Sequence, residues 1–503
     1  MVALIQRPKV HSKLPKEYLL KPMTEAFRGF LGELPKEERI ALVLTNPTLF
    51  GEYYIKPYTR KWNSNTADHQ YYMIEQMMIH HHIVIHVPVE HAKSTWFSLV
   101  LPLWFMCKDR NTQGCIISNT ARQAEGFLRA IKWHMEYNEL FLADFGDYII
   151  PAKKVKWADS AIMIERDSVQ QSKDPTIAAI GTGGAILGAR LDWVVADDIL
   201  DLNNTQTEIL RKKVEDWWLE IIDSRVVEDG RKIVLGTLQH TRDLLCYLSD
   251  LDEYFYVHLD ALDKKDFKTT LWPEQWPYER VMKKKSSIGT LRWNKTMQND
   301  RSAVSAKMLD QSWLHYYDPL NLPPRRLLRI YIGIDPAIAD DRTTAESKQL
   351  DKFGLVVVGF DGSRAYLLEE YCDWLTFPEQ LKLIDAYNKK WQPFKIGIES
   401  VQYQKALAQQ AFMLHSLPPV VAVPVGTQSK VTRIESFSVY CETKRFWITR
   451  DHQQFIEEWL DFEPGAKSPN ILDACFVVMT MITARGRLNE VLLIENNIKH
   501  CTW

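Results

Sequence analysis

The chain lacks the features that would place it in a specialised class. Its 62 Lys and Arg residues nearly balance its 64 Asp and Glu residues, so contact with a polyanion would depend on local basic patches rather than on the field of the whole chain. Its seven cysteines include no CxxC pair, which argues against a zinc ribbon or a disulfide framework and favours a reducing compartment.

Long apolar segments are also missing. The start, MVALIQRPKVHSK, has no apolar signal-peptide core, and the longest apolar stretch, WFSLVLPLWFMC, is too short to span a bilayer. The sequence shows neither repeats nor low-complexity segments. With 503 residues, 46% of them hydrophobic, we expect a soluble intracellular protein of two or more domains with no membrane partner.

Apolar runs that alternate with helical patterns predict an α/β protein whose sheets are covered on both faces. Residues 1–75 are expected to form an N-terminal helical segment and residues 76–318 the first α/β domain. The prolines of DPLNLPPRR indicate a linker over 319–328. We expect a second domain over 329–490, with a hairpin at Asp361–Gly362, and a tail over 491–503.

The first candidate site follows the strand-like run IVIHV. Lys93, Ser94 and Thr95 stand at the start of an apolar helical pattern, which is the layout of a phosphate-binding loop. Backbone N–H groups would hold phosphate oxygens, the lysine would reach the β and γ phosphates, and the hydroxyl would bind Mg²⁺. Val87 and Ala92 occupy positions where the consensus has glycine, so a plain helix start is the alternative.

Two further features follow in the order of an additional-strand ATPase. The apolar strand in RLDWVVADDIL ends in Asp197 and Asp198, and two buried acids are costly unless a cation or hydrogen bonds compensate. In a P-loop NTPase the first acid binds Mg²⁺ through water and the second polarises the attacking water. A strand end that turns into solvent is the alternative. Gly236 and Thr237, in IVLGTLQHTRDLL, stand where a γ-phosphate sensor would lie.

The second candidate site consists of three separated acids. Asp335 lies on a predicted strand (YIGIDPA), Glu399 ends another (FKIGIES), and Asp473 lies in a predicted helix (NILDA). Carboxylates from three elements can converge on two divalent cations, which activate water and stabilise the leaving oxygen in phosphodiester cleavage. The strand–hairpin–strand–helix order is that of an RNase H-like fold. For each acid alone, a capping or surface carboxylate is the alternative.

Together these motifs resemble the large terminase subunit of tailed double-stranded DNA phages, over nearly the whole chain. VPVEHAKST is similar to the family's phosphate loop, LDWVVADDIL to its Walker B strand and LGTLQHTRDL to its coupling motif, while GIDPA, GIES and ILDA match its three nuclease acids in order. The resemblance implies a P-loop ATPase domain followed by an RNase H-like nuclease domain. It also implies an ATP-driven motor that packages viral DNA into procapsids and a metal-dependent endonuclease that cuts concatemers.

The resemblance assigns roles to individual residues. The nucleotide site would comprise Pro88, Glu90, His91, Ala92, Lys93, Ser94, Thr95, Asp197, Gly236 and Thr237. Ser94 and Asp197 would bind the ATPase Mg²⁺, with Asp198 as the catalytic acid. The acids at 335, 399 and 473 would be catalytic and would hold two Mg²⁺ or Mn²⁺ ions. Lys430 and Arg433 would hold the DNA backbone.

The chain departs from the family pattern at three places. Val89 stands where many terminases have an arginine, so an arginine finger would come from Arg190, Arg225 or Arg242, acting within the chain or on a neighbouring subunit. Asp198 is shorter than the frequent glutamate. Asn470 stands where histidine or aspartate is common, and its amide oxygen would be a weaker ligand.

The expected partners are double-stranded DNA, a small terminase subunit, the portal protein of the procapsid, and other copies of the chain in a ring on the portal. The expected location is the host cytoplasm, transiently at the portal and not in the mature virion. Two alternatives stay open at this point: a repair-type helicase-nuclease, and a non-enzymatic capsid or portal component.

Overall fold

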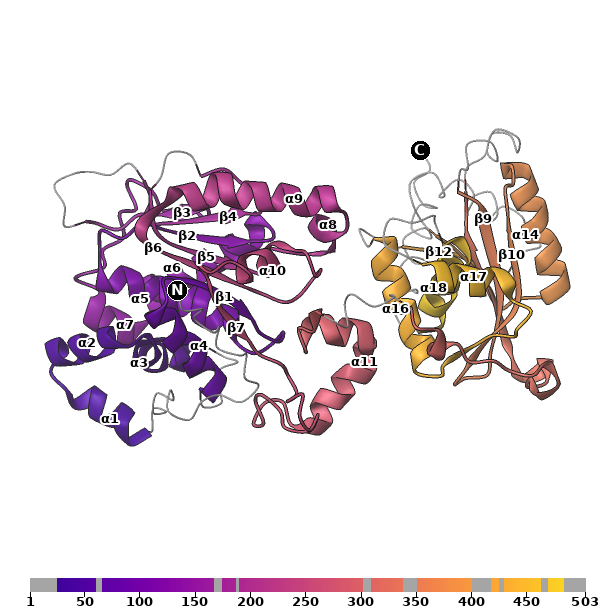
Figure 1. Cartoon of the computed structure of the whole chain (residues 1–503), viewed down its shortest axis with the longest axis horizontal. Helices are drawn as coiled ribbons and strands as arrows, with labels where there is room; N and C mark the ends of the chain where they lie inside the picture. Colours follow the sequence, from indigo (N-terminus) through magenta and orange to yellow (C-terminus); the bar gives the residue numbers. More distant parts are fainter. Residues whose placement is uncertain are drawn as a thin grey trace, which may run out of the picture. The chain divides into compact units, whose positions relative to one another are not determined.

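The computed structural model describes residues 25–59, 66–166, 174–186, 190–301, 309–337, 351–399, 418–424, 429–462 and 469–483 (Figure 1). The chain forms two compact units. The first unit comprises Met1–Lys285 and Arg292–Ser305, and the second unit comprises Ser286–Leu291 and Ala306–Trp503. The predicted linker, 319–328, lies within the second unit.

The first unit contains a seven-stranded sheet in the order β3-β4-β2-β5-β6-β1-β7. Its strands are β1 (His82–His86), β2 (Gly114–Ser118), β3 (Ala161–Ile162), β4 (Ile177–Gly181), β5 (Leu191–Asp197), β6 (Val226–Gly236) and β7 (Phe255–His258). Only β3 runs antiparallel to its neighbour. Strand β6 is inserted between β1 and β5, which confirms the predicted additional-strand order. Strands β3 and β4 were not predicted, because β3 has two residues and the β4 sequence, IAAIG, has few β-formers.

Helices cover both faces of this sheet (Figure 1). The helices of this unit are α1 (Glu25–Glu33), α2 (Lys36–Thr45), α3 (Pro47–Phe50), α4 (Asp68–Ile79), α5 (Leu101–Lys108), α6 (Ala121–Tyr137), α7 (Glu139–Phe145), α8 (Leu202–Thr205), α9 (Glu208–Trp217) and α10 (Leu244–Ser249), with π-helical η2 (Gly51–Ile55), η4 (Thr95–Val100) and η5 (Trp218–Ile222). Helix α11 (Tyr278–Thr296), which is kinked at Gly289, has residues in both units. Alternation along β5 decides which face each side chain meets. Trp193 and Val195 pack in the core with α5 and α6, whereas Val194 packs with α9 and α10.

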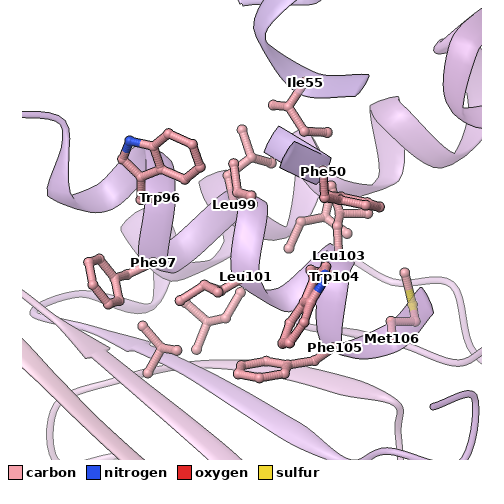
Figure 2. Close-up of a cluster of buried hydrophobic side chains, with 14 of the residues drawn as sticks. Phe50, Ile55, Trp96, Phe97, Leu99, Leu101, Leu103, Trp104, Phe105 and Met106 are labelled. Carbon is pink, nitrogen blue, oxygen red and sulfur yellow. The ribbon is translucent and has the colours of Figure 1, made fainter. Parts of the chain in front are cut away.

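The larger core of the first unit lies around the helix that follows β1. Trp96, Phe97, Leu101 and Leu103 are fully buried there, with Phe50 from α3 (Figure 2). This helix is therefore enclosed by protein, and the loop that precedes it is anchored at its carboxyl end.

The second unit contains a six-stranded sheet in the order β12-β11-β8-β9-β10-β13. Its strands are β8 (Arg329–Asp335), β9 (Phe353–Phe360), β10 (Ala365–Asp373), β11 (Lys395–Glu399), β12 (Val420–Val423) and β13 (Phe446–Trp447). Its helices are α14 (Phe377–Trp391), α16 (Lys430–Glu442), α17 (Gln453–Asp461) and α18 (Asn470–Thr483).

Strands β8, β9 and β10 are antiparallel, whereas β11 pairs parallel with β8, and β12 with β11. Three antiparallel strands followed by two parallel ones are the RNase H-like arrangement that the sequence predicts. The predicted hairpin is confirmed between β9 and β10, where Gly362 has a φ of +100°. Among the described helices, none has the length and hydropathy needed to cross a bilayer.

Candidate functional sites

The predicted phosphate loop lies at the carboxyl end of β1, as the strand order requires. Val87 continues the strand by donating from its N–H to the Gly236 carbonyl oxygen at 3.3 Å. Glu90 and Ala92 then adopt left-handed φ values of +62° and +65°. The consensus glycines of such loops occupy this region without cost, whereas a residue with Cβ is strained there by about 1 kcal/mol. Of the two residues at consensus glycine positions, Ala92 therefore adopts a conformation that glycine favours, whereas Val87 continues the strand.

The helix after the loop starts at Lys93 and is π-helical over Thr95–Val100. Pro102 explains the change, because it has no N–H to donate to the Ser98 carbonyl and its ring would clash there in a regular helix. The wider turn leaves Ser98 fully buried, and its hydroxyl donates to Asp197 Oδ2 at 2.7 Å. The irregular turn therefore joins the loop helix to the end of β5.

Lys93 and Asp198 form the central ion pair of this site. The Lys93 ammonium lies 2.6 Å from Asp198 Oδ1, with the lysine side chain 6% exposed and that of Asp198 36% exposed. Asp198 has a φ of +49° and donates from its N–H to the Leu235 carbonyl at 2.9 Å. That strained backbone turns its carboxylate toward the loop, so the predicted lysine and catalytic acid meet although 105 residues separate them.

Asp197 is fully buried beside Asp198. Burial, and next the charge of Asp198, raise the pKa of Asp197 to about 6, against the opposing effects of Lys93, Ser94 and Ser98. Its Oδ1 is buried without a hydrogen-bond partner among the described residues. An uncompensated buried carboxylate oxygen next to a Ser94 hydroxyl fits a divalent cation with oxygen ligands.

An aromatic platform under the loop was not predicted. The His91 ring stacks on Trp276 with centroids 5.7 Å apart, and Trp276 Nε1 donates to the Glu90 carbonyl at 3.4 Å. His69 Nε2 lies 3.2 Å from the His91 carbonyl oxygen, and the Arg280 guanidinium covers the Trp276 ring at 4.2 Å. The side chain of His91, a predicted nucleotide-site residue, is thus engaged by protein and buried. The only signal of this platform in the sequence is the pair of tryptophans in LWPEQWPYER.

The predicted sensor segment follows β6. Gly236 ends the strand, and a Cβ at this position would lie 2.9 Å from a Leu245 methyl group. Thr237 is buried, and its hydroxyl accepts from Gln239 Nε2 at 3.1 Å. Asp243 is buried and accepts backbone N–H groups from residues 239, 240 and 246, which anchors the segment to the start of α10.

The three candidate arginines lie at different ends of the sheet. Arg190 directly precedes β5 and Arg225 directly precedes β6, so both lie at the amino edge, about 20 Å of strand from Asp197. Arg242 follows the carboxyl end of β6 and is exposed. A finger within the same chain is therefore compatible with Arg242 alone among these three.

In the second unit, the three predicted acids converge. Carboxylate oxygens of Asp335, Glu399 and Asp473 lie within 4.8 Å of one another, and all three residues are buried. Alternation places the first two on the same face, because Ile334 and Ile398 point to the opposite core. Helix α18 covers that face and supplies Asp473.

Close approach of α18 to the sheet depends on two strand glycines. A Cβ on Gly333 would lie 2.3 Å from the Ala474 carbonyl oxygen, and one on Gly354 would lie 2.5 Å from that of Asn470. Glu458, from α17, holds the start of α18 by accepting the N–H groups of residues 471 and 472 at 2.9 and 3.0 Å. These positioning residues were missed, because a glycine or glutamate in sequence does not reveal what packs against it.

The cluster has a perturbed electrostatic environment. Burial, and next the charge of Asp473, raise the pKa of Asp335 well above its usual value. Burial raises the pKa of Asp473 to about 6, although Arg433 and Lys430 oppose the shift. The Oδ1 atoms of Asp473 and Asn470 are buried with no hydrogen-bond partner in the described part of the chain. Such oxygens suit Mg²⁺ or Mn²⁺.

The two predicted DNA-backbone residues lie on α16, three residues apart. Arg433 is buried, and its guanidinium contacts Glu399 Oε1 at 2.5 Å and Asp473 Oδ2 at 3.1 Å. The side chain of Lys430 is 39% exposed, with its ammonium 3.7 Å from the same Asp473 oxygen. Of these two residues, only Lys430 is accessible at the rim, so contact between Arg433 and DNA would require its guanidinium to leave the acids.

No protein-family model matches the chain. Among curated proteins, it resembles the large terminase subunit of Enterobacteria phage T3, with 25% identity over 182 residues, which are 35% of this chain and 27% of the T3 protein. The chain thus spans little more than a quarter of the length of this curated relative.

Solved structures of large terminases are also similar. That of a thermophilic bacteriophage, in complex with ADP, is 12% identical, with 81% of this chain and 96% of that chain covered and a TM-score of 0.47. That of bacteriophage HK97 is 11% identical, with 88% and 99% covered and a TM-score of 0.36. The human cytomegalovirus terminase nuclease domain is 12% identical, with 36% and 97% covered and a TM-score of 0.28. The fold assignment itself rests on the strand orders given above.

Proposed function

We propose that the chain is a large terminase subunit: an ATP-driven motor that packages viral double-stranded DNA into procapsids, and a metal-dependent endonuclease that cuts the concatemer. One observation carries the proposal, namely that a single chain holds both a Lys93–Asp198 pair at a phosphate loop and a buried cluster of three acids on an RNase H-like sheet. A capsid or portal component would need neither site.

In the ATPase, Lys93 neutralises the transferred phosphate, and the Asp198 carboxylate orients and polarises the attacking water. Ser94 and Asp197 bind the Mg²⁺ that accompanies ATP, and Mg²⁺ supplies charge stabilisation for the phosphates. Before nucleotide binds, Lys93 and Asp198 neutralise each other, so ATP must separate them. Arg242 supplies the arginine finger, in the same chain or in a neighbour of the ring.

In the nuclease, Asp335, Glu399 and Asp473 hold two Mg²⁺ or Mn²⁺ ions, which activate water and stabilise the leaving oxygen. Asn470 adds an amide oxygen. Lys430 holds the DNA backbone at the rim, and phosphate contacts of this kind carry no base information, so cleavage shows little sequence preference. The partners are double-stranded DNA, a small terminase subunit and the portal, with activity in the host cytoplasm and at the portal.

A crossed mutant test separates the two activities. Lys93→Ala should abolish ATP hydrolysis and retain Mn²⁺-dependent cleavage of plasmid DNA, because its site lies in the first unit. Asp335→Ala should lose cleavage and retain ATP hydrolysis. Stimulation of the ATPase by a portal-bearing procapsid would distinguish packaging from a repair helicase-nuclease. Wild-type protein with neither activity in Mg²⁺ and Mn²⁺ would remove the proposal.

A further inference from the structure

The guanidinium of Arg433 lies inside the acidic cluster and not at its rim. Its Nη1 and Nη2 contact Glu399 and Asp473, and its side chain is 4% exposed. A guanidinium stays protonated under all ordinary conditions. The cluster therefore contains a permanent positive charge where two of the three carboxylates would face a metal ion.

Formal charge limits what else this buried site can hold. Three ionised carboxylates carry three negative charges, of which Arg433 cancels one and a single divalent cation cancels the other two. A second divalent cation beside Arg433 would leave two uncompensated positive charges in a desolvated site, which is strongly unfavourable. Lys430 contributes less positive charge to the buried cluster than Arg433 does, because its ammonium is partly exposed to solvent and also lies close to Asp351.

The hydrogen bonding shows where the first ion fits. Arg433 and Lys430 contact Asp473 through Oδ2, whereas Oδ1 of the same carboxylate is buried with no partner among the described residues. The Arg433 guanidinium contacts Glu399 and Asp473 rather than Asp335. One cation can therefore contact Asp335 and Asp473 Oδ1 while the Arg433 contacts persist, but Glu399 Oε1 and Asp473 Oδ2 become available only when Arg433 leaves.

We propose that Arg433 is a built-in counter-ion that restricts the DNA-free nuclease site to one divalent cation, and that a second cation enters when the guanidinium moves to a DNA phosphate. The inference rests on the proposed nuclease function. It makes Arg433 a positioning residue that couples metal loading to the presence of DNA, so the complete two-metal site forms only on substrate.

Calorimetric titration of the full chain with Mn²⁺, without nucleotide or DNA, tests the proposal. The Asp335→Asn variant serves as the baseline, because the Mn²⁺ ions that it still binds lie outside the acidic cluster. Wild type should bind one Mn²⁺ ion more than this variant. Arg433→Gln should bind two, the first at least about tenfold more tightly because a nearby positive charge is gone. Lys382→Gln, the loss of an exposed charge on α14, which packs on the opposite face of the sheet, should bind one ion with an affinity within about threefold of wild type. Adding a phosphorothioate DNA duplex should raise the wild-type count to two.

Each outcome is decisive. Two ions bound to DNA-free wild type would overturn the proposed role of Arg433. So would an Arg433→Gln variant that binds the same number of ions as wild type with the same affinity. Neither result would contradict the proposed nuclease site. A wild-type count equal to that of Asp335→Asn would remove the proposed metal site itself. If circular dichroism shows that Arg433→Gln is unfolded, the wild-type counts with and without DNA decide, together with Arg433→Lys, which should keep the count at one.

Discussion

Gly333→Ala tests whether the approach of α18 to the sheet creates the nuclease site. The added Cβ would lie 2.3 Å from the Ala474 carbonyl oxygen and 2.5 Å from a Val478 methyl group. Ordinary contact needs about 3.4 Å, so α18 must retreat by roughly 1 Å. Ala474 directly follows Asp473, and the carboxylate must move with it.

The expected magnitudes follow from that displacement. Overpacking should destabilise the second unit by about 1–3 kcal/mol. A misplacement of about 1 Å at a catalytic group lowers the rate by about a hundredfold. The assay is the initial rate of plasmid nicking in Mn²⁺, with ATP hydrolysis measured on the same samples and expected to be unchanged.

Gly359→Ala is the matched control on neighbouring β9. Its Cβ would meet only side-chain methyl groups, of Leu328 at 3.1 Å and Leu368 at 3.2 Å, which can shift by a few tenths of an ångström. It should nick DNA within about threefold of wild type, since side chains relax more readily than a helix backbone. Wild-type nicking by Gly333→Ala, or an equal loss in both variants, would refute the reasoning.

Three further outcomes are expected. Asp198→Asn should lower ATP turnover by at least about a hundredfold, because polarisation of the attacking water is lost. ATP binding, measured by equilibrium titration, should be retained because the phosphate contacts remain. Normal turnover in this variant would place the catalytic carboxylate elsewhere. Mixing Arg242→Ala with Lys93→Ala should restore part of the ATPase activity if the finger acts between subunits, and the same mixtures with Arg190→Ala and Arg225→Ala test the other candidates. Burial raises the pKa of Glu458 to about 7. A carboxyl group whose pKa is higher in the folded state stabilises the fold below its unfolded pKa, and that stability is lost as pH rises toward 7. The metal-free unfolding temperature of the second unit should therefore fall between pH 4.5 and 8, and Glu458→Gln should flatten this dependence; an unchanged slope would exclude Glu458 as a contributor.

The sequence alone was sufficient for the local chemistry. Strand-end acids and a lysine at a strand-to-helix junction are short-range patterns, so the sequence itself indicates Lys93, Asp197, Asp335 and Glu399 as candidates. The hairpin at Asp361–Gly362 was also predictable from neighbouring residues. An Asp-Gly pair between two apolar strands favours a tight turn, because glycine readily adopts a positive φ. Strands β3 and β4, the last two at one end of the sheet, were missed, since the pairing of β4 with β2 and of β3 with β4, and not propensity, makes them strands.

Only the tertiary structure decided how far apart these groups lie and what holds them. The platform of Trp276 under the loop, the cap that Glu458 forms on α18, and the glycines that admit that helix all involve partners distant in sequence. The same is true of Arg433, whose spacing from Lys430 suggests an exposed basic face, yet whose side chain is buried among carboxylates. A periodic pattern shows which residues share a face, but the packing of other elements determines whether that face meets solvent or an opposite charge.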